Sequence, residues 1–283
     1  MRLLRIGNVG HEQPVVMDAS NASFEVPASY GDFNGSFFES GAVDELRQAL
    51  SKETLAPFDI TGKRIGAPIA RPGKIVCIGL NYRDHAEETG LAIPEEPVVF
   101  LKAPNCMVGP NDDVMIPRAS TKCDWEIELA VVISKTARYL DSVEQAADHI
   151  AGYALANDMS ERVFQMERGG QWDKGKSCET FNPLGPWLAT PDEIASSSDL
   201  SLTLKVNGVT RQDSNTKHMI FNVNYIIWYL SQFMVLEAGD LINTGTPAGV
   251  SFGHDDVPFL TAGDVLDLGI SGLGTQTNRL VQA

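Results

Sequence analysis

The pattern of apolar and polar residues first predicts a small unit built from short elements. Apolar runs at 2–6 and 14–17, each bounded by turn residues, are typical of short strands. The apolar residues within 43–50 have helical spacing and predict a helix. A connector rich in Gly and Pro follows at 66–73 and indicates a boundary.

We therefore expect a small N-terminal domain over residues 1–70 and a main domain over 71–283. In the main domain, the pattern predicts a helix running into a strand over 143–156 and an amphipathic helix over 222–233. Strands are expected at 75–78, 97–102, 125–133, 202–206, 240–244 and 265–270. Because helices and strands do not alternate regularly, a doubly wound parallel sheet is disfavoured, and we predict a β-rich α+β fold.

Composition and charge narrow the class of protein. The 283 residues are 43% hydrophobic and 21% charged, which is typical of a soluble globular protein with a sizeable core. The net charge of −15 repels phosphate backbones and anionic lipid, so we expect no nucleic-acid partner and no membrane surface. No signal core or membrane-spanning run occurs, which favours a cytoplasmic enzyme. The four cysteines, without a CxxC pair, are expected to be inert thiols.

The strongest local signal is an acidic stretch within the predicted strand at 125–133 and just before it. Side chains alternate along a strand, so Asp124, Glu126 and Glu128 should share one face. The apolar run that follows, 129–133, indicates that the strand enters the core. Buried carboxylates need compensation, and a hard dication such as Mg²⁺ or Mn²⁺ would provide it. A strand with one solvated acidic face would explain the same pattern.

Asp158 ends a second apolar segment, where Asn157-Asp158 would project a carboxylate from the end of a sheet; the same dipeptide is also common in turns. Beyond it lie Arg162, Gln165 and Lys176. Positive side chains beside an acidic metal site are what an anionic substrate requires, although surface solubility would account for them as well.

His85 and Glu88 follow Asn81-Tyr82 and are three residues apart, so they would share a face of a helix. A carboxylate beside an imidazole raises its basicity, which suits a general base acting on water. An exposed helix carrying a simple His–Glu pair is the alternative.

Five motifs occur in a fixed order: NYxxHAxE, DxExELxVVI, NDxSxR, GKSxxTFxPLGPW and GTPAGV. In this combination the chain, from about Arg71 to its C-terminus, resembles the fumarylacetoacetate hydrolase family. It looks closest to the branch of bacterial 2,4-diketo-3-deoxy sugar-acid hydrolases, which act on L-rhamnonate or L-fuconate derivatives. The resemblance implies a mixed β-sandwich roll behind a small N-terminal domain, and a homodimer.

The resemblance also implies roles for individual residues. Glu126, Glu128 and Asp158 match the carboxylates that bind Mg²⁺ or Mn²⁺, whereas Asp124 matches no standard ligand. His85 and Glu88 match a catalytic pair on a segment that orders over the substrate. The remaining matches are residues facing the substrate: Lys176, Gln165, Arg162, Thr246 and Lys102.

The activity implied is hydrolysis of the C3–C4 bond of a 2,4-diketo acid, giving pyruvate and a second acid such as lactate. In this mechanism a metal chelates a small anionic 2-oxo acid, His85 activates water, and Lys176 stabilises the enolate. A 2-hydroxy-dienedioate isomerase and an oxaloacetate-type decarboxylase are the alternatives within the family. A non-catalytic metal-binding module is disfavoured, because mere binding does not require an acid/base pair.

Overall fold

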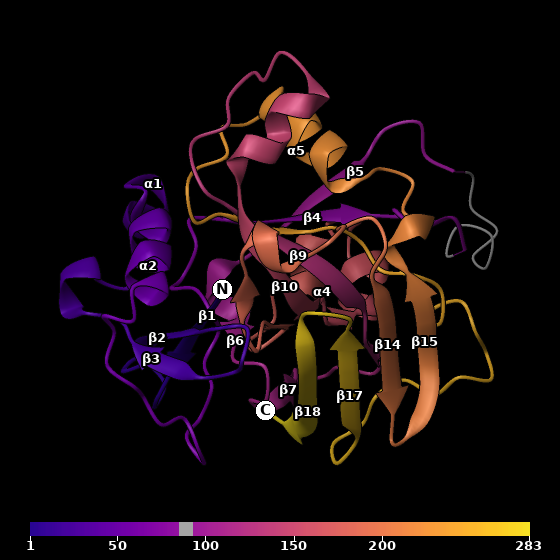
Figure 1. Ribbon diagram of the computed structural model, residues 1–283. Coiled ribbons are helices and arrows are strands. Elements are labelled where there is room, and N and C mark those ends of the chain that lie inside the picture. The colour runs from indigo at the N-terminus through magenta and orange to yellow at the C-terminus, as the bar shows by residue number, and fades with distance from the viewer. Residues whose placement is uncertain (85–92) are drawn as a thin grey trace.

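The computed structural model describes residues 1–84 and 93–283, and strands dominate it (Figure 1). Most of the strand residues in the described chain belong to two sheets, with few helices around them. The predicted β-rich α+β fold is therefore confirmed, while the finer description as a sandwich roll stays a prediction. None of the helices within the described ranges is long and apolar enough to cross a membrane.

The larger sheet is mixed and has nine strands. Its order from edge to edge is β3 (Ser23–Glu25), β2 (Gln13–Met17), β1 (Arg2–Ile6), β13 (Leu188–Ala189), β10 (Ile150–Asn157), β9 (Ile127–Ile133), β16 (Leu241–Asn243), β4 (Ile75–Gly79) and β5 (Val98–Lys102). Only the pair of β16 and β4 is parallel among these described strands. Every residue of β9 and β10 is buried, so these two strands form the centre of the core.

The first 70 residues extend this same sheet. Strand β1 pairs with β13 in antiparallel register, Arg2 opposite Ala189, and β2 and β3 continue outward. Helices α1 (Gly35–Glu39) and α2 (Ala42–Ser51) lie beside these strands at the left of Figure 1, and α2 contains the helix predicted at 43–50. A domain boundary at residue 70 stays a prediction, because the two parts share one sheet and one core.

The second sheet has five strands: β15 (Val209–Asn215), β14 (Ser201–Val206), β17 (Val265–Ile270), β18 (Gly274–Gln282) and β7 (Val114–Ile116). Along β14, exposed and buried residues alternate, as expected for a strand with one face in the core. Strand β14 contacts β9, and β18 contacts β10. The two sheets therefore enclose the core between them.

Short elements connect the sheets and carry much of the chemistry. They are the strands β6 (Met107–Val108), β8 (Cys123–Asp124), β11 (Ser160–Glu161) and β12 (Asn182–Pro183), the 3-10 helices η1 (Ala28–Tyr30), η2 (Pro104–Cys106), η3 (Val143–His149), η5 (Pro191–Glu193) and η6 (Thr216–His218), the π-helix η4 (Val163–Glu167), and the α-helices α4 (Asp173–Lys176) and α5 (Val223–Ser231). Helix α5 starts at Asn222, whose side chain accepts a hydrogen bond from the N–H of Tyr225.

Three of the four thiols are buried: those of Cys77, Cys106 and Cys123. Burial raises the pKa of the Cys106 thiol to about 11, so this group stays protonated and unreactive. The expectation of inert, buried cysteines is met at these three positions.

Candidate active site

The register of β9 and β10 brings three carboxylates together. The strands are antiparallel, with Glu128 opposite Ala156 and Ile127 opposite Asn157. One step further, the N–H of Asp158 donates to the carbonyl of Glu126 at 2.8 Å. Ligand atoms of Glu126, Glu128 and Asp158 all lie within 4.8 Å of one another, and all three side chains are buried. The alternative of a solvated acidic face is therefore wrong, and the described cluster has the donor set of a hard divalent cation.

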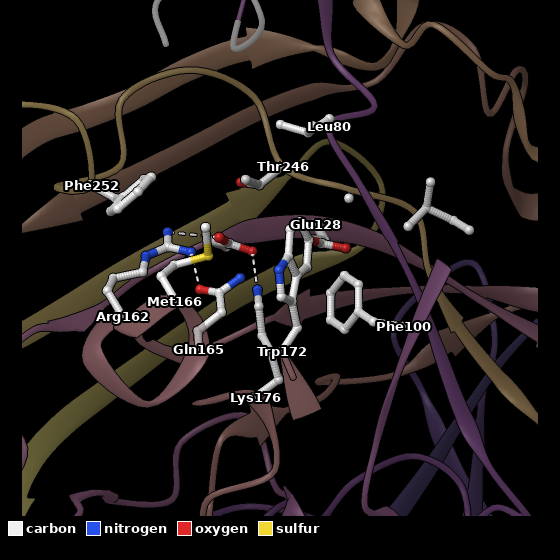
Figure 2. A pocket seen from close by; sticks show the side chains of 13 residues that line it. Leu80, Phe100, Glu128, Arg162, Gln165, Met166, Trp172, Lys176, Thr246 and Phe252 are labelled. Atoms are coloured by element: carbon white, nitrogen blue, oxygen red, sulfur yellow. Dashed lines mark hydrogen bonds and ion pairs between the residues drawn. The ribbon is translucent and has the colours of Figure 1, made fainter. Parts of the chain in front are cut away.

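Two cationic side chains, Lys176 and Arg162, lie beside the acidic cluster in the pocket (Figure 2). The Lys176 ammonium donates to Glu126 at 2.6 Å and to Asp158 at 2.9 Å. Burial lowers the pKa of Lys176, but the negative charges of Asp158 and Glu126 outweigh it and raise that pKa above its ordinary value. The guanidinium of Arg162 bonds to Glu126 at 2.7 Å. The site therefore contains positive charge, although the net charge of the whole chain is negative.

The carboxylate of Glu128 is less well compensated. It accepts one hydrogen bond, at 2.7 Å, from the N–H of Gly245. Burial raises the pKa of Glu128 well above its ordinary value, and the charges of Asp158 and Glu126 raise it further. A bound dication would remove this unfavourable energy, so the electrostatics fit a metal position beside Glu128.

Asp124 departs from the predicted pattern. The strand is interrupted at 125–126, between β8 and β9, although Asp124 and Glu126 still bond to the same nitrogen of Arg162. The Asp124 carboxylate lies 2.8 Å from the guanidinium of Arg162 and accepts the N–H groups of Ser251 and Phe252 at 2.9 and 3.0 Å. It joins Arg162 to the loop 251–252, which is consistent with leaving it out of the metal ligands.

Lys102 lies behind the acidic cluster. Its buried ammonium pairs with Asp158 and donates to the carbonyl oxygens of Met159 at 3.2 Å and Phe181 at 2.8 Å. It is not among the described residues that line the pocket. The structure therefore gives Lys102 a contact with a candidate metal ligand, and its expected role in binding substrate stays a prediction.

A pocket opens onto the carboxylates, and Figure 2 shows the side chains around it. Its deepest groups are polar and nearly fully buried: Glu126, Glu128, Arg162, Gln165, Lys176 and Thr246. Around them stands an apolar wall, by which we mean Ile78, Leu80, Phe100, Met166, Trp172 and Phe252. The predicted residues Arg162, Gln165, Lys176 and Thr246 thus come together at one pocket with the three acids.

Neighbouring residues hold two of these polar side chains in place. The amide oxygen of Gln165 accepts from Arg162 at 3.0 Å. The hydroxyl of Thr246 donates to the carbonyl of Ile127 at 2.9 Å and accepts from the amide of Gln212 at 2.8 Å. Gly175 makes room for η4, since a Cβ there would lie 2.7 Å from the Cβ of Gln165. The short helix α4 can therefore present Lys176 directly beside η4.

The segment that contains the predicted acid/base pair is only partly described. His85 and Glu88 lie outside the described residues. Asn81, just before them, is fully buried and donates to the carbonyl oxygens of Phe221 and Thr244 at 3.0 and 2.7 Å. The chain therefore leaves β4 at the edge of the pocket, next to the loop that carries Thr246.

Sequence reasoning missed two groups of site residues. The first comprises backbone and polar supports, above all Gly245 and Gln212. Gly245 has φ +100°, and a Cβ there would lie 2.7 Å from that of Asn81, so the GTPAG motif did contain a signal. The second group is the apolar wall. Aromatic residues such as Phe100 and Trp172 have the same pattern as core residues, so nothing in the sequence separates them.

Three known proteins resemble the chain over nearly its full length. A Burkholderia ambifaria protein, named as a hydrolase without a stated substrate, is 47% identical over 277 residues, which are 98% of this chain and 97% of that protein. The structure of 5-carboxymethyl-2-hydroxymuconate delta-isomerase from Mycobacterium smegmatis gives a TM-score of 0.79 at 31% identity, covering 100% of this chain and 99% of the other. Maleylpyruvate hydrolase from Sphingobium sp. SYK-6 gives a TM-score of 0.82 at 28% identity, covering 100% of both chains.

A family profile described as fumarylacetoacetate (FAA) hydrolase C-terminal matches residues 74–281. The chain belongs to this family, whose solved members include hydrolases and an isomerase. The family resemblance seen in the sequence motifs is confirmed. The sugar-acid branch within the family stays a prediction.

Proposed function

We propose that this protein is a metal-dependent hydrolase that cleaves the C3–C4 bond of a 2,4-diketo acid. The products are pyruvate and a second acid, which would be lactate for 2,4-diketo-3-deoxy-L-rhamnonate or L-fuconate. The observation that carries the proposal is the buried triad of Glu126, Glu128 and Asp158 in direct contact with two cationic side chains, Lys176 and Arg162.

The metal that suits this triad is Mg²⁺ or Mn²⁺. The three ligands offer carboxylate oxygen only, which hard dications prefer to nitrogen or sulfur. When bound, such an ion supplies Lewis acidity to the oxygen atoms of a 2-oxo acid. The charge of the dication also offsets the repulsion among the three acids.

The protein's own side chains position the substrate and stabilise charge. Arg162 and Gln165, which bond to each other, and Thr246 would orient the carboxylate of a small anionic 2-oxo acid. Lys176 remains protonated, so its ammonium can stabilise negative charge that develops on the C2 oxygen during cleavage. Lys102 would act as a positioning residue, because its contacts hold Asp158.

Water activation is assigned to His85, with Glu88 orienting it, on sequence grounds. In that step His85 takes a proton from water, and the resulting hydroxide bonds to C4. The C3–C4 bond then breaks, its electron pair passes to C3, and the enolate takes up a proton to give pyruvate. The oxygen from water remains in the second acid.

Two other activities of this family are alternatives to the proposed hydrolysis. One solved relative is named as an isomerase, and an isomerase of 2-hydroxy-dienedioates would move protons without adding water. An oxaloacetate-type decarboxylase would form the same enolate by losing CO₂. Neither activity requires a base for water. A metal-binding module without catalysis would have no use for Lys176 and Arg162 in the pocket.

The test is a coupled assay for pyruvate with lactate dehydrogenase, using Mg²⁺ and a panel that includes diketo sugar acids and oxaloacetate. We expect pyruvate from diketo acids, and loss of at least about 10²-fold in the His85→Ala variant. Oxaloacetate turnover should fall less, since decarboxylation needs no hydroxide. Faster wild-type turnover of oxaloacetate than of every diketo acid would favour the decarboxylase instead. Full activity of metal-stripped protein in chelator would refute the proposal.

A further inference from the structure

We infer that the substrate carries a single carboxylate and that its acyl end, beyond C4, is apolar: an alkyl or aryl group. This inference rests on the proposed function for the chemistry at C1 to C4. It adds the chemical character of the other half of the substrate, which the family alone leaves open.

The first observation is the apolar wall. A 2-oxo acid head bound at the triad lies deep in the pocket, because the acids and Lys176 are almost fully buried. The acyl end must then pass the side chains between the triad and the mouth, where Met166 is 44% exposed. These side chains are mainly hydrocarbon and aromatic, so burying the CH₂ groups of the acyl end against them would favour binding.

Part of the wall depends on close packing between β4, β5 and the segment that carries Trp172. The indole of Trp172 packs on the ring of Phe100 with centroids 5.3 Å apart. Gly79, at the end of β4, permits this position, since a Cβ there would lie 2.7 Å from the Trp172 ring. Any larger residue at position 79 would displace the indole from the pocket. The backbone and both aromatic rings are therefore fitted to one another.

The second observation is where the positive charge lies. Arg162 and Lys176 are the cationic residues among the described residues of the lining. Arg162 already pairs with Asp124 and Glu126, and Lys176 with Glu126 and Asp158. Beside the described part of the wall, a second carboxylate at the acyl end would lose water without gaining an unpaired cation from Arg162 or Lys176, which is unfavourable.

The inferred substrate differs from the one in the name of a solved relative. Muconate is a dicarboxylate, and the name of the Mycobacterium smegmatis isomerase adds a carboxymethyl group to it. In contrast, the wall here would suit an acyl end with at most one hydroxyl, for which the indole N–H of Trp172 offers a donor. A methyl-terminated acyl end with one hydroxyl meets that description, and so do plain alkyl and phenyl groups.

The experiment compares two ligands of equal length that cannot be cleaved: 2-oxohexanoate and 2-oxohexanedioate. They differ only in a terminal methyl against a terminal carboxylate, and both lack the C4 carbonyl. Binding to the Mg²⁺-loaded protein is measured by calorimetry, with quenching of the protein's tryptophan fluorescence as a second readout. We expect the monoacid to bind at least about tenfold more tightly. Equal or tighter binding of the diacid would overturn the inference.

A charge placed in the wall provides the second arm. Met166 is partly exposed, so Met166→Arg can fold, and its guanidinium would meet a terminal carboxylate. We expect this variant to tighten binding of the diacid by about tenfold and to reduce the preference for the monoacid. The matched control, Met166→Leu, keeps an apolar side chain and should keep the wild-type preference. An unchanged diacid affinity in Met166→Arg would count against the inference.

The two ligands also separate this inference from the proposed function. If no diketo acid is hydrolysed but the monoacid still binds more tightly, the proposed reaction fails and the assignment of the acyl end stands. If diketo acids are hydrolysed but the diacid binds more tightly, the proposed reaction stands and the assignment of the acyl end fails.

Discussion

Lys102 and Asp158 form an ion pair in which neither side chain is exposed to solvent. Two carbonyl oxygens, of Met159 and Phe181, complete the acceptors around the ammonium. The second oxygen of Asp158 accepts from Lys176 at 2.9 Å. Lysines thus approach Asp158 from two sides, and the one that does not line the pocket fixes the carboxylate from behind.

Replacing Lys102 by Met should therefore affect stability and metal binding together. The change leaves a buried carboxylate with one cation fewer, so we expect the free energy of unfolding to fall by about 3–5 kcal/mol. Urea denaturation measures this, and calorimetry should show weaker binding of Mg²⁺. The control is Lys122→Met, which removes a surface pair with Glu167 worth about 0–1 kcal/mol. Similar losses in both variants would argue against a special role for Lys102.

Glu128→Gln should stabilise the metal-free protein. The pKa of Glu128 is raised above its ordinary 4.5, so above that pH the unfolded chain releases a proton that the folded protein retains. The folded state therefore loses stability as pH rises toward the raised pKa, and Gln avoids this loss. In chelator, we expect the Tm advantage of the variant to grow from about pH 5 to about pH 8. An advantage that is constant with pH would mean that Glu128 titrates normally.

The metal should reverse the order of stability of these two proteins. Mg²⁺ binds the folded state, so it should raise the Tm of the wild type at about pH 8 and raise that of Glu128→Gln much less. Differential scanning fluorimetry with a Mg²⁺ titration gives both values. Equal shifts in the two proteins would show that Glu128 does not contribute to the site.

Gly245→Ala tests the backbone donor to Glu128. The added Cβ would meet that of Asn81 at 2.7 Å, in a backbone with φ +100°. Gly263 is a matched control, because its φ is +98° and nothing lies within 4 Å of an added Cβ. Both variants carry the strain of the left-handed region, about 1–2 kcal/mol. Only Gly245→Ala should also weaken Mg²⁺ binding, which calorimetry measures. Equal Mg²⁺ affinity in the two variants would show that Gly245 does not support the metal site.

The expected homodimer can be tested at a particular surface. Several large apolar side chains around α5 and β5 are exposed: Val99, Leu101, Phe233 and Val235. Such a cluster is unusual on a monomer. We expect light scattering to give twice the mass of one chain, and Phe233→Lys to give one. Val9→Lys, at a 74% exposed residue of the N-terminal hairpin, should leave the mass unchanged. A monomeric wild type would end the dimer hypothesis.

The acidic strand residues were conspicuous in the sequence because they adjoin an apolar run, and the family resemblance selected Glu126, Glu128 and Asp158 among the acids. Glu126 and Glu128 precede a run of core residues, and Asp158 ends another, so their meeting needed only an antiparallel register. The interruption at 125–126 was not predictable, because the hydrogen bonds of Asp124 come from residues 251 and 252, far along the chain. Register and long-range contacts are properties of the folded chain.

The sequence predicted several individual strands well, but it did not predict which strands pair with each other. The strands at 2–6, 75–78 and 265–270 match β1, β4 and β17. The Gly/Pro connector suggested that the first residues stand apart, yet β1 pairs with β13. The sequence of a short apolar strand does not identify the strand it pairs with, because β propensity depends on neighbours that only the tertiary structure supplies.

The apolar wall and the acidic triad come from different parts of the chain. The triad is fixed by the pairing of β9 with β10, while the wall is supplied by β4, β5, η4 and the loops that hold Trp172 and Phe252. Changes in the wall therefore need not disturb the acidic triad. A duplicated gene could acquire a new acyl preference through one or two substitutions such as Met166→Arg, and directed evolution of this enzyme should begin there.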